Sequence, residues 1–268
     1  MDLGLSERTA LVTGSWRGTG RGIARVLARE GAHVLVHGFE LEPARAVADA
    51  LRAEGGRASA VAGDIRSADG ADLVADAALE AAAGRVDVLV NNYGVAEGPG
   101  WLDGEDADWL DLYHKNVLSG VRLVRRLVPG MKERGFGRVI FISTVGSVRP
   151  AARMPHYYAS KAALPTMTVS LAKELAHTGI TVNTVSPGLV ATDEVKQRFL
   201  RLGAERGWGD TWDEVESHAA RAFLDNPTGR VGAPEDVGEL IAFLAGERSW
   251  YINGVDLRID GGAADCAR

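Results

Sequence analysis

The sequence has few of the features that mark secreted, membrane-spanning or metal-binding proteins. Its single cysteine, Cys266, leaves no intrachain disulfide and no cysteine-based metal site. No apolar run approaches the length of about 18 residues that a transmembrane helix needs. The short, charged segment before the first apolar run is unlike a signal peptide. We therefore expect a soluble cytoplasmic protein that does not bind membranes.

Positive charge is also scarce. The chain has 30 Lys and Arg residues against 36 Asp and Glu residues, a net charge of −6. A nucleic-acid-binding protein needs a basic surface, so binding of DNA or RNA is excluded as the main function. The shares of hydrophobic residues (46%) and charged residues (25%) are typical of a globular protein and exclude disorder, a collagen-like repeat and a coiled coil.

Short apolar runs alternate with longer helical patterns along the chain. We expect strands at residues 9–13, 33–37, 58–62, 86–90, 138–142, 180–185 and 255–259. We expect helices at residues 23–29, 43–54, 69–83, 106–134, 155–176 and 234–245. Continuous apolar strands separated by helices indicate a parallel sheet covered on both faces. With right-handed crossovers, the pattern predicts an α/β, doubly wound Rossmann fold of about seven strands.

The chain shows neither a linker nor an internal repeat, so we expect a single domain over residues 1–268. One segment, residues 189–229, has no regular pattern and is rich in charge and tryptophan. Long irregular insertions are commonly functional, and we expect this one to be a lid over the substrate. Such segments vary independently of the fold, so the sequence does not name the substrate.

Three of the 33 glycines, Gly14, Gly18 and Gly20, follow the first expected strand. They permit a tight turn and let backbone N–H groups approach a pyrophosphate at a helix N-terminus. The spacing differs from the common G-x-G-x-x-G pattern, and such a turn can also be purely structural. Ligands of doubly wound sheets bind beyond the carboxyl ends of the strands, so the turn is a candidate dinucleotide site.

Two residues near that turn bear on the choice of cofactor. An acid at the end of the second strand binds the ribose 2′-OH of NAD and repels a 2′-phosphate, but Gly38 stands there. Arg17 offers a forked guanidinium to a phosphate, and a solvated surface residue is the lesser alternative. Glu40 is the alternative partner of a ribose. We expect a preference for NADP(H) over NAD(H).

Tyr157 and Lys161 are four residues apart and therefore share one face of a helix. Hydride transfer to a ketone leaves negative charge on oxygen, which needs a proton. A phenol has a pKa of about 10, and a nearby ammonium lowers it. Tyr158 points about 100° away and cannot replace its neighbour. We expect Tyr157 to act as the acid and Lys161 to lower its pKa.

Taken together, these segments resemble the classical short-chain dehydrogenase/reductase family. Residues 13–20 look like its T-G-x-x-x-G-x-G turn, and residues 91–94 are similar to its N-N-A-G motif. Tyr157-x-x-x-Lys161 resembles its catalytic pair. Residues 9–262 contain all the motifs in order. The resemblance implies reversible hydride transfer from NADPH to a ketone. Plausible substrates are a carrier-linked 3-oxoacyl group, as in 3-oxoacyl reductases, and a cyclic or aromatic ketone.

The resemblance also implies two further catalytic residues. Asn116 matches an asparagine on the long fourth helix that opens a proton relay through the lysine. The family places a hydroxyl thirteen residues before the tyrosine to orient the substrate carbonyl, and this is Thr144 here. Ser143 is the competitor if the intervening loop carries one extra residue.

The remaining implied residues hold the cofactor. Asp64 is expected to bind the adenine and Asn91 to support the adenosine half. Thr192 and the backbone near Leu189 are expected to hold the nicotinamide amide, in a segment that begins with the family-like pair Pro187 and Gly188. Tyr93 stands where the family usually has alanine, either as a packing change or as a side chain that crowds or stacks near the cofactor. The family also implies a homotetramer built through two long helices.

Two rival functions remain at this point, an NAD-dependent alcohol dehydrogenase and a catalytically silent NADP-binding sensor. His33 and His37 flank a buried strand without a further ligand, so we expect no metal site. His156 is expected to face away from Tyr157. The three tryptophans that follow the fourth and sixth strands are equally consistent with packing and with substrate contact; they are Trp101, Trp208 and Trp212.

Overall fold

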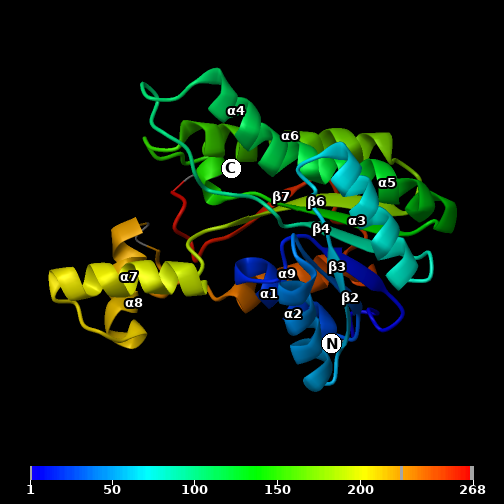
Figure 1. The fold of residues 1–268 in the computed structure, drawn as a ribbon, viewed down its shortest axis with the longest axis horizontal. Coiled ribbons are helices and arrows are strands. Elements are labelled where there is room, and N and C mark those ends of the chain that lie inside the picture. The colour runs from blue at the N-terminus through cyan, green and yellow to red at the C-terminus, as the bar shows by residue number, and fades with distance from the viewer. Residues whose placement is uncertain (1, 224–225, 266–268) are drawn as a thin grey trace.

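Seven parallel strands form one sheet in the order β3–β2–β1–β4–β5–β6–β7 (Figure 1). The structure is a computed structural model that describes residues 2–223 and 226–265, so Cys266 lies outside the described residues. The strands are β1 Thr9–Val12, β2 His33–Gly38, β3 Arg57–Ala62, β4 Val88–Asn91, β5 Gly137–Ile142, β6 Ile180–Pro187 and β7 Asp256–Ile259. The order reverses between β1 and β4, which is the position where doubly wound sheets bind ligands. The predicted fold class is confirmed.

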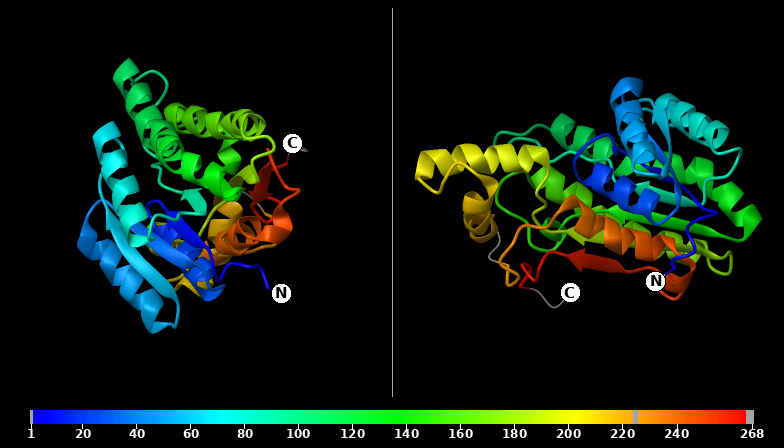
Figure 2. Two further views of the ribbon diagram at one scale, coloured as in Figure 1. Left: turned by 90° about the vertical axis from the view of Figure 1, so that its right-hand side faces the viewer. Right: turned by 90° about the horizontal axis from the view of Figure 1, so that it is seen from below.

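Helices cover both faces of the sheet (Figure 2). The first layer contains α1 (Gly18–Arg29), α2 (Leu41–Ala53) and α9 (Pro234–Ala245). The second contains α3 (Ala68–Ala81), α5 (Ser119–Arg134) and α6 (Pro155–Glu174). Alternate strand side chains enter the two cores, so Val12 packs in the first and Leu11 in the second.

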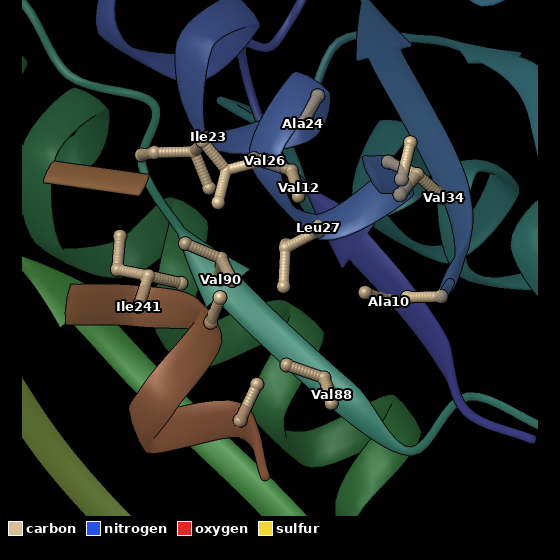
Figure 3. Close-up of a cluster of buried hydrophobic side chains, with 14 of the residues drawn as sticks. Ala10, Val12, Ile23, Ala24, Val26, Leu27, Val34, Val88, Val90 and Ile241 are labelled. Carbon is tan, nitrogen blue, oxygen red and sulfur yellow. The ribbon is translucent and has the colours of Figure 1, made fainter. Parts of the chain in front are cut away.

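The helix that follows the glycine-rich turn is held by unusually close packing. A Cβ atom on Gly22 would lie 2.4 Å from Pro234 Cβ, and one on Gly238 would lie 2.7 Å from Val26 Cγ2. Helices α1 and α9 therefore approach through glycine, and Ile23, Val26 and Ile241 fill the core beside them (Figure 3). This packing fixes the N-terminal end of α1 beside the carboxyl ends of the strands.

The long helix expected at residues 106–134 is interrupted. It consists of α4 (Asp106–Tyr113), a π-helical turn (His114–Leu118) and α5. Such turns commonly occur at functional sites. Helix α2 begins two residues before Pro43, which is tolerated because the N–H groups of a first helical turn have no partner within the helix.

Residues 189–229 were expected to be irregular, and that expectation is wrong for much of the segment. It contains α7 (Asp193–Arg206) and α8 (Trp212–Phe223), which project from the sheet body (Figure 1). The helices bury a small core of their own that includes Phe199, Val215 and Ala219. Their high charge concealed the spacing of these few apolar residues. Residues 224–225 of the segment lie outside the described residues.

Over residues 2–223 and 226–265, no helix is both long and apolar enough to cross a membrane. The same residues contain no group of three or more His, Cys, Asp or Glu side chains arranged to hold a metal ion.

Candidate active site

The turn between β1 and α1 needs glycine at three of its positions. Gly14 and Gly18 adopt left-handed φ angles of +62° and +55°. A Cβ atom on Gly20 would lie 2.5 Å from the Gly14 carbonyl oxygen and equally close to Asn92 Nδ2. All three glycines are thus required for this backbone path.

Two side chains from neighbouring strands hold the turn. Asn92 Nδ2 donates hydrogen bonds to the carbonyl oxygens of Thr13 (2.8 Å) and Gly14 (3.3 Å). His37 Nδ1 accepts from the Gly14 N–H (3.0 Å), and its Nε2 donates to the Gly63 carbonyl (3.1 Å). Burial lowers the pKa of His37 to about 4, so the ring is neutral. Sequence reasoning missed His37 in this role, although its position at the end of the second strand was a usable signal.

The side chain of Asn91 points elsewhere. Its amide is buried close to Gly120, and neither amide atom has a hydrogen-bond partner within the described structure. The role expected for Asn91 beside the adenosine stays a prediction.

The N-terminus of α1 suits an anion. The N-cap residue, Arg17, makes no side-chain capping bond, and the first turn of the helix has no acidic residue. Its N–H groups and the positive end of the helix dipole are therefore available. The glycine cradle and the uncapped helix together fit a dinucleotide pyrophosphate.

Steric crowding at the end of β2 explains why a side chain is absent there. A Cβ atom on Gly38 would lie 3.1 Å from the Glu40 carbonyl oxygen and 3.3 Å from Trp16 Cδ1. The Arg17 guanidinium lies 4.6 Å from the centre of the Trp16 ring and forms an ion pair with Glu194, with 3.1 Å between Nη1 and Oε1. The end of β2 thus lacks a carboxylate at position 38, and the nearest part of the Arg17 environment is the Trp16 ring on which the guanidinium stacks.

A cluster of aromatic and charged groups lies beside the ends of β2, β3 and β4. Both carboxylate oxygens of Asp64 accept from the Arg66 guanidinium at 2.8 Å, which lowers the pKa of Asp64. Arg66 lies 4.9 Å from the centre of the Phe39 ring, and Phe39 meets Tyr93 edge to face at 5.1 Å. Tyr93 thus packs on Phe39, and its burial raises the pKa of the phenol.

Tyr157 and Lys161 lie on α6, in the second helix layer. Lys161 is buried, and its Nζ donates to the Ile142 carbonyl at the end of β5 (2.8 Å). Burial lowers the pKa of Lys161 to about 8. Burial raises the pKa of Tyr157 to about 12, and this outweighs the lowering of that pKa by the neighbouring Thr144 hydroxyl.

In the protein alone, desolvation of the phenol outweighs the influence of the Thr144 hydroxyl on the pKa of Tyr157. The lysine ammonium itself is directed at the Ile142 carbonyl. The expectation that Lys161 lowers the pKa of Tyr157 stays a prediction.

The two adjacent hydroxyls at the end of β5 have different partners. Ser143 Oγ is buried and donates to the Lys161 carbonyl oxygen (2.9 Å). That carbonyl has no helical partner because Pro165, four residues later, lacks an N–H group. Thr144 is partly exposed and faces Tyr157. The geometry therefore favours Thr144 as the hydroxyl open to a ligand.

Asn116 lies buried in the π-helical turn. Its Oδ1 accepts from the Val95 N–H (2.8 Å), while its Nδ2 donates to the Val95 carbonyl (3.1 Å) and to Ser160 Oγ (3.0 Å). A Cβ atom on Gly94 would lie 2.6 Å from Lys161 Nζ and 3.0 Å from Asn116 Oδ1. The glycine after Tyr93 thus lets Asn116 and Lys161 converge.

The segment after β6 approaches the glycine-rich turn. β6 ends at Pro187, and the next residue, Gly188, donates its N–H to the Ile259 carbonyl (3.0 Å). Thr192 caps α7 by accepting from the Val195 N–H (3.3 Å). Its Cγ2 lies 3.5 Å from the position of a Cβ atom on Gly18.

The other candidates from the sequence fall outside this constellation. His33 Nε2 pairs with Ser59 Oγ (2.9 Å). The buried His156 ring meets Trp109 at 4.5 Å, within the packing between α4 and α6. Trp101 is exposed, whereas the two tryptophans of the α7–α8 segment, Trp208 and Trp212, pack against its small core.

Comparison with known proteins gives a consistent family. A sequence model described as short chain dehydrogenase matches residues 8–202. The uncharacterized oxidoreductase YvaG of Bacillus subtilis is 36% identical over 269 residues, covering 98% of each chain. The 3-oxoacyl-[acyl-carrier-protein] reductase FabG of Vibrio cholerae is 32% identical over 260 residues, which cover 97% of this chain and 98% of FabG.

The same relationship holds in three dimensions. L-sorbose reductase from Gluconobacter frateurii, solved in complex with NADPH and L-sorbose, superposes with a TM-score of 0.91 at 32% identity. The match covers 99% of this chain and 100% of the reductase. The chain therefore belongs to the short chain dehydrogenase family of oxidoreductases, which act on CH–OH and C=O groups with a nicotinamide cofactor.

Proposed function

We propose that this protein is an NADPH-dependent reductase that converts a ketone to a secondary alcohol and catalyses the reverse reaction. The observation that carries the proposal is the convergence of the Tyr157 phenol with the Thr144 hydroxyl, beside the buried Lys161. A proton donor, a second hydroxyl and a cation are the groups that carbonyl reduction requires.

Each group has a distinct task in this scheme. When bound, the nicotinamide ring supplies the hydride in reduction and accepts it in oxidation. Thr144 donates a hydrogen bond to the substrate oxygen and orients the carbonyl. Tyr157 Oη–H transfers its proton to that oxygen, and the Lys161 ammonium stabilises the phenolate left behind.

Asn116 is the proposed relay residue. Its amide is bonded to the Val95 backbone and to Ser160, so the side chain is fixed next to Lys161. From there it supports the return of a proton from solvent to Lys161 and Tyr157.

The cofactor is proposed to lie along the carboxyl edge of the sheet. The N–H groups around Gly14, Gly18 and Gly20 would hold its pyrophosphate. Asp64 and Asn91 would support the adenosine half. The nicotinamide half would meet Lys161 and the segment that contains Pro187, Gly188 and Thr192.

Two features support NADP(H) as the preferred cofactor. Arg17 stacks on Trp16, whose ring borders Gly38 at the end of β2, and a carboxylate is absent from position 38. A guanidinium attracts the 2′-phosphate of NADPH, whereas an acid would repel it. The similar L-sorbose reductase was solved with NADPH.

The test is a panel of ketones followed by NADPH absorbance, with dissociation constants for NADPH and NADH at fixed salt. One charge-assisted contact contributes about 1.5–3 kcal/mol, so Arg17→Ala should weaken NADPH binding roughly tenfold to a hundredfold. NADH binding should barely change. Equal weakening of both cofactors would contradict the NADP(H) assignment. Tight NADPH binding without turnover of any ketone would favour the sensor.

We also propose a cytoplasmic homotetramer. A groove of about 530 Å³ between α5 and α6 is lined by apolar side chains that include Val124, Met167 and Leu171. Light scattering coupled to size exclusion should give four times the monomer mass, and Val124→Glu should reduce it. A monomeric wild type would contradict the assembly, and cell fractionation tests the location.

A further inference from the structure

Arg17 is already engaged by a carboxylate from the α7 helix. Arg17 Nη1 lies 3.1 Å from Glu194 Oε1, and both side chains are more than half exposed. A parallel ion pair joins Arg21 Nη2 and Asp193 Oδ2 at 2.9 Å. Two ion pairs thus join the beginning of α1 to the first turn of α7. Helix α7 is the first helix of residues 189–229, the segment expected to cover the substrate.

We infer that Glu194 is a specificity-determining residue, because it competes with the 2′-phosphate of NADP(H) for Arg17. The inference rests on the proposed function. To reach Arg17, NADPH must displace Glu194, whereas NADH binds with the ion pair intact. A phosphate carries close to two negative charges and a carboxylate one, so the phosphate displaces Glu194 from Arg17. Because the ion pair must be broken, the affinity for NADPH is lower than it would be without Glu194. Glu194 therefore narrows the preference for NADPH over NADH.

The surroundings of Arg17 allow this exchange. The guanidinium stacks 4.6 Å from the centre of the Trp16 ring, which itself borders Gly38 at the end of β2. Arg17 thus lies between the β2 end, where the ribose phosphate is expected, and α7. Because both partners of the ion pair are solvated, the pair is weak enough to be displaced.

The competition also links the cofactor to α7. Once Arg17 turns to a phosphate, Glu194 is released and the Arg21–Asp193 pair remains as the charged contact between these two helix turns. By linkage, the Arg17–Glu194 pair weakens NADPH binding by the same factor by which NADPH weakens the pair.

The experiment measures dissociation constants of NADPH and NADH for Glu194→Gln at low, fixed ionic strength. Exposed ion pairs shift equilibria by about 1.4-fold to fivefold, so NADPH binding should tighten by a factor in that range while NADH binding stays constant. The gain should shrink in high salt, which screens the pair. Asp193→Asn is the matched control, since it removes the same charge one residue away from a pair that does not include Arg17. Asp193→Asn should change the ratio of the NADPH affinity to the NADH affinity less than Glu194→Gln does.

A double-mutant cycle distinguishes failure of the Glu194 competition from failure of the proposed NADP(H) preference. In an Arg17→Ala background, Glu194→Gln should have no effect on either cofactor. If Arg17→Ala alone leaves the ratio of the NADPH affinity to the NADH affinity unchanged, the NADP(H) assignment itself fails. If Arg17→Ala lowers this affinity ratio but Glu194→Gln does not raise it, only the competition between Glu194 and the 2′-phosphate is overturned. An equal gain from Asp193→Asn would also overturn it, by showing a general field effect.

Discussion

The two halves of the sheet's carboxyl edge are built in different ways. Over β1, β2 and β3, the edge consists of glycine-rich backbone. Two side chains, His37 and Asn92, hold this backbone by hydrogen bonds. Over β4, β5 and β6, it consists of side chains that are themselves buried and bonded, foremost Lys161 and Asn116. In the proposed function, the first half provides shape and N–H donors, whereas the second contains the side chains to which we assign proton transfer and its support.

The difference predicts how each half responds to change. A substitution in the glycine-rich half acts through sterics and the position of the backbone, so it should impair stability and cofactor binding together. A conservative substitution in the other half removes a chemical group while the fold persists.

Tyr157→Phe should reduce turnover by a factor on the order of 10² or more and leave NADPH binding largely intact, because it removes only the proton donor. Steady-state rates and cofactor titration check this. Tyr158→Phe is the matched control and should retain turnover, since its ring packs against Gly146. Full activity in Tyr157→Phe would refute the mechanism.

His37 should make the glycine-rich half sensitive to acid. Its pKa is about 4 in the folded protein and near 6.5 when unfolded, so the unfolded chain binds more protons between these values. The free energy of unfolding should therefore fall as pH drops from about 6.5 to about 4, by up to about 3 kcal/mol. Urea unfolding of wild type and His37→Gln across this range measures the difference in slope. Identical slopes would show that His37 is not buried as a neutral ring.

Gly20→Ala should lower the free energy of unfolding by about 1–3 kcal/mol and weaken cofactor binding, because its Cβ would meet the Gly14 carbonyl oxygen at 2.5 Å. Gly130→Ala is the control: its Cβ would face the flexible end of Arg134 within α5, and stability should hold or rise. Denaturant unfolding and cofactor titration of both variants check this. Unchanged cofactor binding in Gly20→Ala would remove the turn from the site.

Ser143→Ala should lower the free energy of unfolding by about 1–2 kcal/mol, because it leaves the buried Lys161 carbonyl without a donor. Pro165→Ala restores a helical N–H to that carbonyl, so the double variant should recover stability. Failure of this rescue, measured by urea unfolding, would contradict the shared partner. Thr144→Ala should instead cost most of the activity, and Thr144→Ser should retain it.

Much of this architecture was predictable from local patterns. The apolar runs predicted all seven strands and their parallel arrangement, since buried parallel strands have a composition of their own. The spacing of Tyr157 and Lys161 predicted one helical face because that geometry depends on four residues alone. The helices of residues 189–229 were missed because their apolar faces are short and pack chiefly against each other.

What the sequence alone determined is therefore the set of elements and the order of the motifs along one edge, since both follow from local periodicity and from right-handed crossovers. Only the tertiary structure gave the partners of adjacent side chains. Ser143 and Thr144 are neighbours at the end of a strand, where successive side chains take different directions, and only in the folded chain does Ser143 donate to the Lys161 carbonyl while Thr144 stays partly exposed. It also decided the partner of Arg17, because ion pairs between distant segments depend on where the folded chain brings α1 and α7.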